Sequence, residues 1–105
     1  MTVQQIVGSD TKDPIERLDW TENWADILDP IKDTIAKFWV VVTFYKGDDT
    51  PTDELIVGGE QNTSRDTTAF VEEGILGRKY VVSHIIKTAG GRVFKRSHLI
   101  TIVRK

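Results

Sequence analysis

Few side chains in this sequence of 105 residues could do chemistry, because it contains no cysteine and two histidines. Without a thiol there is neither a cysteine nucleophile nor a thiolate ligand, so a zinc site would need carboxylates beside His84 and His98. The two histidines fall on the arms of an expected hairpin in which residue 84 pairs with about residue 95, so they are out of register. We therefore expect two ordinary strand histidines and no metal site.

The other polar clusters predict no catalytic group. Ser83 and His84 are neighbours in an expected strand, where adjacent side chains point to opposite faces, so they cannot form a triad with Asp66. The acids within residues 48–54 lack the spacing of a calcium-binding loop, which favours a solvated turn. The glycine pairs fit no phosphate-binding pattern. The sequence thus predicts a protein that is not an enzyme and binds no cofactor.

The tryptophans Trp20, Trp24 and Trp39 offer a second kind of site, because exposed aromatic rings can stack against sugars. Trp20 and Trp24 share one face of an expected strand, and Trp39 lies inside the most apolar segment. This placement favours packing in a core or an interface. A carbohydrate-binding or adhesion module is the alternative function, and it requires at least one exposed tryptophan on a concave face.

The elements that position these residues are expected to be strands. The sequence has 11 Val, 11 Ile and 12 Thr, against 5 Leu and 4 Ala. β-branched side chains suit a pleated surface and lose χ1 freedom in a helix. The length fits one small domain. Composition therefore predicts a single mostly-β domain.

Hydrophobic spacing and turn residues divide the chain into about six strands. The period of two from Leu18 to Trp24 favours a strand, although the four-residue spacing of two tryptophans also permits a helix. Gly90 and Gly91 permit the positive φ of a tight hairpin. Strands at this spacing predict an antiparallel, immunoglobulin-like β-sandwich. The expected strands are 18–24, 34–45, 55–57, 67–71, 78–88 and 92–103.

The segment 34–45 has the strongest strand signal. Its continuous apolar run predicts a central strand covered on both faces, or a strand with one face against the core and the other against a neighbouring subunit. Residues 46–51 are expected to form a turn and residues 26–33 an irregular connection.

The N-terminal residues divide into two predicted parts. Residues 1–12 are polar and predict an arm that is ordered only if the body or a partner holds it. Asp13, Pro14 and Glu16 then fit the N-cap, N1 and N3 positions of a short helical turn. The sandwich domain is accordingly expected over 13–105.

Gly77 lies three residues before Tyr80 at the start of a long expected strand. This spacing is similar to the tyrosine corner of immunoglobulin-like sandwiches, in which the hydroxyl bonds back to upstream backbone. The predicted role is structural.

The C-terminal third resembles a family of small proteins of tailed bacteriophages. Their pattern is a G-x-x-Y strand, an ITTAGGR-like hairpin and a final alternating strand, which here corresponds to residues 77–92, Arg96-Ser97 and 100–102. The earlier part agrees through residues 13–20, Trp24, residues 33–35 and Trp39, with Trp20 where the family usually has Tyr. The resemblance covers about residues 13–104.

This resemblance implies an immunoglobulin-like fold and a non-enzymatic role in the virion. Such proteins are described as phage fibre–tail adaptors or small virion structural proteins. The expected partners are other phage structural proteins of the tail, neck or fibre, with copies forming a ring-like homo-oligomer. The protein would be made in the host cytoplasm and act in the particle.

Charge is distributed unevenly along the chain. Residues 1–36 hold 8 acids and 3 bases, whereas residues 74–105 hold 8 bases and no acid. The pI of 5.6 and the scarcity of aromatics in the basic stretch argue against nucleic-acid binding. No apolar run approaches the roughly 18–20 residues of a membrane span.

We expect the acidic and basic ends to meet, because the first and last strands of such sandwiches are commonly neighbours. The contact would form within the fold or across a subunit boundary, and would orient docking. The predicted interface residues are Asp13, Glu16, Asp19, Lys95 and Arg96.

Overall fold

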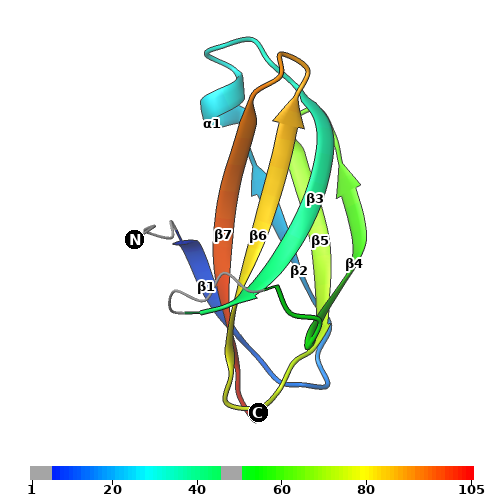
Figure 1. Cartoon of the computed structure of the whole chain (residues 1–105), viewed down its shortest axis with the longest axis vertical. Coiled ribbons are helices and arrows are strands. Elements are labelled where there is room, and N and C mark those ends of the chain that lie inside the picture. The colour runs from blue at the N-terminus through cyan, green and yellow to red at the C-terminus, as the bar shows by residue number, and fades with distance from the viewer. Residues whose placement is uncertain (1–5, 46–50) are drawn as a thin grey trace.

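Seven strands and one short helix make up the described part of the chain, residues 6–45 and 51–105, in this computed structural model (Figure 1). In chain order they are β1 (Ile6–Lys12), β2 (Leu18–Asn23), α1 (Ala25–Leu28), β3 (Ile35–Phe44), β4 (Leu55–Asn62), β5 (Asp66–Glu73), β6 (Lys79–Thr88) and β7 (Val93–Ile102). No helix in these residues is long and apolar enough to cross a membrane.

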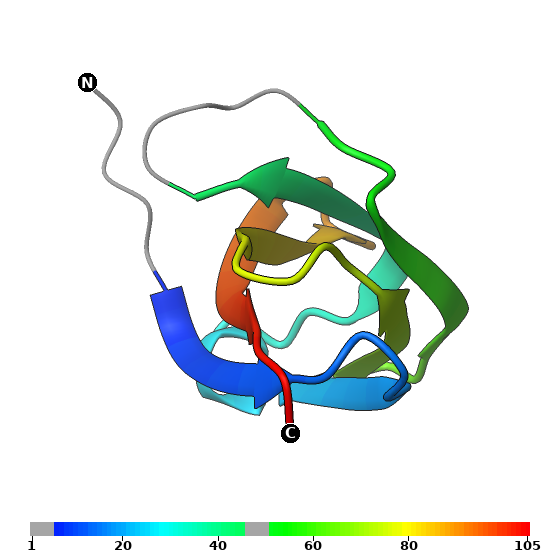
Figure 2. The same cartoon turned by 90° about the horizontal axis from the view of Figure 1, so that it is seen from below.

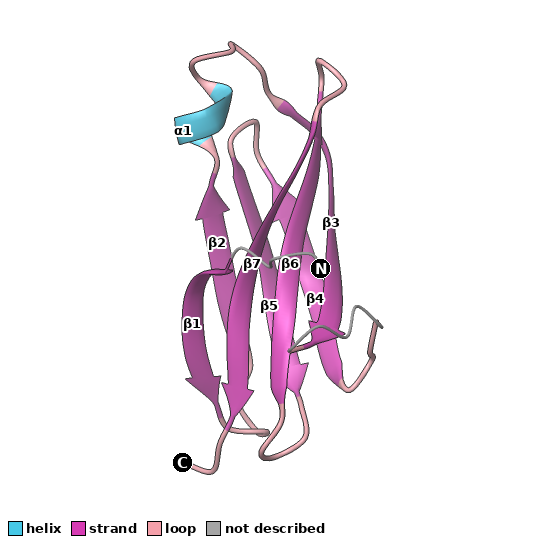
Figure 3. Ribbon diagram, turned by 60° about the vertical axis from the view of Figure 1, so that its left-hand side comes forward, coloured by secondary structure: helices cyan, strands magenta, loops and turns pink. Residues whose placement is uncertain are grey.

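The strands form two facing sheets (Figures 1 and 3). One has four strands in the order β1-β7-β6-β3, and the other has three in the order β2-β5-β4. Neighbouring strands run antiparallel, except that β1 runs parallel to β7. The predicted all-β antiparallel sandwich is confirmed, and its immunoglobulin-like topology stays a prediction.

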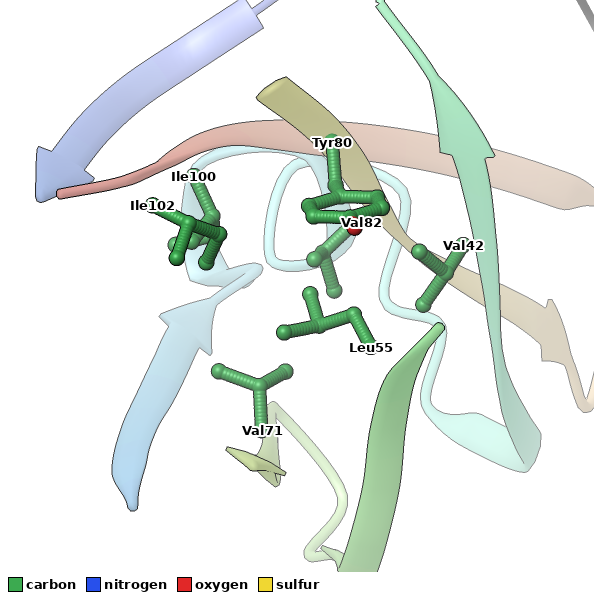
Figure 4. Close-up of a cluster of buried hydrophobic side chains, with 7 residues drawn as sticks. All are labelled: Val42, Leu55, Val71, Tyr80, Val82, Ile100 and Ile102. Atoms are coloured by element: carbon green, nitrogen blue, oxygen red, sulfur yellow. The ribbon is translucent and has the colours of Figure 1, made fainter. Parts of the chain in front are cut away.

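The core between the sheets consists of two clusters, and Figure 2 shows from one end how the strands surround it. Burial of each large apolar side chain stabilises the fold by about 1.5–3 kcal/mol. The first cluster, drawn in Figure 4, contains Val42, Leu55, Val71, Tyr80, Val82, Ile100 and Ile102. The second, below α1, contains Trp24, Leu28, Ile35 and Ile86.

Residues 6–12 form β1, whereas the sequence predicts an arm over residues 1–12. The backbone of this strand pairs with β7 from Ile6 to Lys12. Lys12 is fully buried, and its ammonium donates to the carbonyl oxygen of Glu73 at 2.6 Å. Residues 6–12 thus meet the condition of the prediction, because the body of the fold holds them through backbone pairing, which requires no apolar pattern. Residues 1–5 lie outside the described residues.

The turn at residues 13–16 forms, but no helix follows it. Asp13 accepts the Ile15 amide at 3.0 Å, and Glu16 accepts the Asp13 amide at 2.8 Å, as in a capping box. The chain then enters β2. Helix α1 lies instead in the predicted irregular connection, where the Asn23 side chain accepts the Ala25 amide at 2.9 Å.

Strand β3 lies at an edge of its sheet, so the first of its two predicted alternatives, a central strand, is wrong. Among the described strands it pairs with β6 alone. Strand β4 continues beyond the predicted end at 58–59, because the register shifts there and Gly59 adopts a φ of 62°. The predicted turn at 46–51 and the acids Asp48 and Asp49 fall mostly or wholly outside the described residues.

Candidate functional site

Strand β3 carries apolar side chains on both of its faces. Val40 and Val42 contact the core, so Trp39 and Val41 beside them point away from the other sheet. Trp39 is 40% exposed although it is the largest side chain on this strand. The surface that we term the outer face of the four-stranded sheet comprises Lys37, Trp39, Val41, Ile85, Lys87, Val93 and Lys95.

The outer face has an apolar centre and a basic rim. Trp39 pairs with Ile85, which in turn pairs with Lys95 on β7. In the next row of the sheet Lys37 pairs with Lys87. All three lysines are exposed. An exposed apolar centre surrounded by charges of one sign is typical of a protein-docking surface.

The two basic residues predicted as interface point in opposite directions. Lys95 belongs to the outer face, whereas Arg96 points between the sheets. The Arg96 guanidinium binds the carboxylates of Glu22 and Asp26, both at 2.6 Å, and lies 4.7 Å from the Trp24 ring centroid. The sequence predicts that the acidic and basic residues meet within the fold or across a subunit boundary. Arg96 meets its acidic partners within the fold.

The three acidic residues predicted as interface residues also have different environments. Asp13 accepts the Lys105 amide at 2.8 Å and Glu16 binds the Lys105 ammonium at 3.0 Å, so both fasten the C-terminal end. Hydrogen bonds from backbone amides lower the pKa of both carboxyls. Asp19 is exposed on β2. Strand β2 lies in the other sheet, so β1 and not β2 is the neighbour of β7.

The three tryptophans have different environments. Trp24 is fully buried, and its Nε1 donates to the Thr67 hydroxyl at 2.9 Å. Trp20 is half-buried and lines a cavity between the sheets. Trp39 alone among the three is more than a third exposed. A sugar platform would therefore have to use Trp39, whose partners in the sheet are apolar or basic.

Both histidines contact Trp20, which the sequence did not predict. His84 pairs with Arg96, one residue from the predicted partner, and the histidines are out of register. Their rings nevertheless lie 3.8 Å and 4.8 Å from the ring centroid of Trp20. Burial lowers the pKa of His84 to about 4 and also lowers that of His98. His84 is therefore neutral at pH 7.

Tyr80 has the geometry of the predicted corner. Its hydroxyl accepts the amide of Ile75 at 3.0 Å and donates to Glu54 at 2.9 Å. The side chain is fully buried, and burial raises the pKa of its phenol. Gly77 lies between donor and tyrosine with a φ of 86°, a conformation that favours glycine.

Asp33 binds the glycine hairpin, a contact that the sequence did not predict. Gly91 has a φ of 87°, and Gly90 donates its amide to Asp33 at 3.0 Å. Asp33 also binds Arg92 at 3.0 Å. A hydrogen bond from the Thr88 hydroxyl is the largest cause that lowers the pKa of Asp33 to about 2, and hydrogen bonds from backbone amides add to it. Because Asp33 is more than fifty residues from its hairpin partners, no local pattern signals this contact.

These features describe an all-β sandwich whose outer face has an exposed apolar centre and a basic rim. Within residues 6–45 and 51–105, no group of metal-ligating side chains comes together. The largest exposed aromatic side chain there, Trp39, lies on the outer face of the four-stranded sheet.

A protein family described as the podophage GP4 fiber-tail adaptor protein gp77 matches residues 12–101. The match spans most of the chain, so the chain belongs to this family. The predicted resemblance to phage fibre–tail adaptors is confirmed. No curated protein sequence matches the chain significantly.

Proposed function

We propose that this protein is a non-enzymatic structural part of a tailed phage particle and joins tail to fibre through protein–protein contacts. The family supports the adaptor role. The observation that carries the contact mechanism is the edge strand β3, which is apolar on both faces while Trp39 is 40% exposed. An edge strand needs apolar residues on its outer side only if another surface covers them.

The occupant of the outer face is a neighbouring protein with an apolar centre and an acidic rim. Lys37, Lys87 and Lys95 would pair with that rim, while Trp39 and Ile85 would be buried at the centre. Large aromatic residues dominate the energetics of such contacts, whereas exposed ion pairs contribute about 0–1 kcal/mol each and mainly set orientation.

Substitution at the outer face tests the proposal. Trp39→Lys should leave the circular dichroism spectrum and melting temperature nearly unchanged, and should reduce copurification with particles by roughly tenfold or more. Ile15→Lys is the matched control, because Ile15 is 90% exposed in a turn away from this face. Normal incorporation of the Trp39 variant would contradict the docking role.

Copies of the chain are further proposed to associate head to tail in a ring around the tail. Lys95 is exposed on the four-stranded sheet and Asp19 on the three-stranded sheet. Because these residues lie on different sheets, contact between unlike faces of two copies could bring opposite charges together. Such heterologous contacts generate rings when the rotation closes.

A further inference from the structure

A cavity of about 140 Å³ lies between the sheets and is lined by residues of β1, β2, β5, β6 and β7. Its walls are mainly apolar and include Trp20, Ala69, Val82 and Ile100. The volume is close to the roughly 150 Å³ of an engineered apolar cavity that holds one benzene molecule. The cavity therefore has room for one six-membered ring.

Two imidazole rings, those of His84 and His98, line this cavity, and the ring of His84 has a defined hydrogen-bond role. Trp24 Nε1 donates to the Thr67 hydroxyl at 2.9 Å, and that hydroxyl lies 2.8 Å from His84 Nδ1. A hydroxyl carries one hydrogen, and with Trp24 donating to its oxygen that hydrogen is free to go to His84 Nδ1. The neutral imidazole then holds its own proton on Nε2.

The Nε2–H donor of His84 lacks a partner. The side chain is fully buried, and Nε2 has no hydrogen-bond partner among the described residues. Buried polar groups are nearly always paired, since each unpaired one costs about 1–3 kcal/mol. A donor at the wall of a ring-sized apolar cavity fits a ligand that brings an acceptor.

We propose that this cavity receives one tyrosine side chain of a neighbouring protein in the particle, whose hydroxyl oxygen accepts the Nε2–H of His84. The aromatic ring would pack against Trp20 and Ala69. Aromatic side chains seated in pockets are the usual anchors of protein interfaces. Asp10 and Asp19, exposed on the two strands that flank the cavity, would meet backbone amides or basic groups of the same partner. This inference rests on the proposed function.

Nitrogen NMR of the imidazole rings in the whole protein tests each step. The His84 resonances should show the Nε2–H tautomer at pH 7. Phenol, and N-acetyltyrosinamide as a peptide-like probe, should shift His84 Nε2 in a saturable manner. Toluene has the same shape without an acceptor and should perturb the ring of Trp20 but not move His84 Nε2 in the same way.

Ala69→Leu is the blocking variant, because its larger side chain would fill the cavity. It should stay folded and lose at least about tenfold in phenol affinity. Ala36→Leu is the matched control and should bind phenol normally, because Ala36 is exposed on β3 and does not line the cavity. An Nδ1–H tautomer, an unresponsive Nε2 or unchanged binding by the Ala69 variant would overturn the pocket. Binding of phenol without binding of N-acetyltyrosinamide would overturn the tyrosine as occupant.

The two proposals fail separately. If phenol does not bind but Trp39→Lys still loses incorporation, the outer-face docking stands and the pocket is refuted. If phenol binds and the Trp39 variant incorporates normally, the adaptor contact must lie elsewhere than the outer face.

Discussion

At the scale of single residues, the buried ammonium group of Lys12 joins parts of the chain that are far apart in sequence. The Lys12 ammonium donates to the carbonyl oxygens of Asp13, Pro14 and Glu73, so it ties β1 and the following turn to the end of β5. Burial lowers the pKa of Lys12. Three carbonyl acceptors compensate the cost of burying the charge.

The buried histidine makes stability depend on pH. His84 has a pKa of about 4 in the folded protein and an ordinary value of 6.5, so the unfolded chain binds more protons between these values. Stability is fully present above about pH 6.5 and falls as the pH drops toward 4. The loss should reach roughly 3 kcal/mol. Urea unfolding at pH 7 and pH 4 measures it.

A matched pair of variants separates the two histidines in that experiment. His98 also has a lowered pKa and contributes with the same sign, whereas Asp33, at about 2, acts below pH 4. His98→Gln should therefore keep most of the pH dependence and His84→Gln should remove most of it. Equal slopes in both variants would show that His84 is not the main titrating group.

Removal of the Tyr80 hydroxyl tests the tyrosine corner. Tyr80→Phe leaves the Ile75 amide and the Glu54 carboxylate without their partner, and should lower the free energy of unfolding by about 1–2 kcal/mol. Tyr45→Phe, the same change at the other tyrosine, is the control and should have a smaller effect. Chemical denaturation measures the free energy of unfolding of both variants. An unchanged value for the Tyr80 variant would contradict the tyrosine corner.

At the scale of elements, the hairpin between β6 and β7 depends on one left-handed residue. Gly91 has a φ of 87°, so Gly91→Ala should cost about 1–2 kcal/mol of strain and lower the melting temperature by roughly 4–8 °C per kcal/mol. Gly58→Ala is the control, because its Cβ would meet no atom within 4 Å and its φ is not positive. An unchanged melting curve for the Gly91 variant would contradict this turn geometry.

Helix α1 and β2 are fastened to β7 by Arg96. Arg96→Met removes the bonds to Glu22 and Asp26 and leaves the largely buried Glu22 carboxylate without its partner, so unfolding should become easier by about 1–2 kcal/mol. Lys95→Met is the control on the exposed side of the same strand. Thermal unfolding measures both, and equal melting temperatures would show that the Arg96 contacts are weak.

Most strands could be predicted from the sequence, because their β-branched residues alternate or run together between turn signals. Strand β1 could not, since backbone pairing and one lysine hold it. Helix α1 has only four residues, too few for a periodic signal. The apolar run of β3 can be seen in the sequence. Whether the strand lies at the centre or at the edge of its sheet depends on the order of the strands, which the run does not give.

The candidate sites were less predictable for the same reason. Trp39 and Lys95 were identified, but their place on one outer face requires the register of β3, β6 and β7. The contact of both histidines with Trp20 joins strands from opposite sheets. Sequence spacing describes neighbours within one strand, and says nothing about the strand across the sandwich.

At the scale of the whole molecule, the two sheets expose different charges. Lys37, Lys87 and Lys95 surround the apolar centre of the four-stranded sheet, and Asp19 is exposed on the three-stranded sheet. Contact between the lysine-bearing face of one copy and the Asp19-bearing face of the next would bring opposite charges together, whereas two lysine-bearing faces would repel each other.

A charge exchange tests this arrangement between copies. Lys95→Glu and Asp19→Lys should each reduce copurification with particles by about 2–5-fold, because each places like charges across the contact. The double variant restores opposite charges in reversed order and should recover incorporation. All three proteins should keep the melting temperature of the parent, since both side chains are exposed. If the double variant is as poor as the single ones, Asp19 and Lys95 do not meet in the assembled ring.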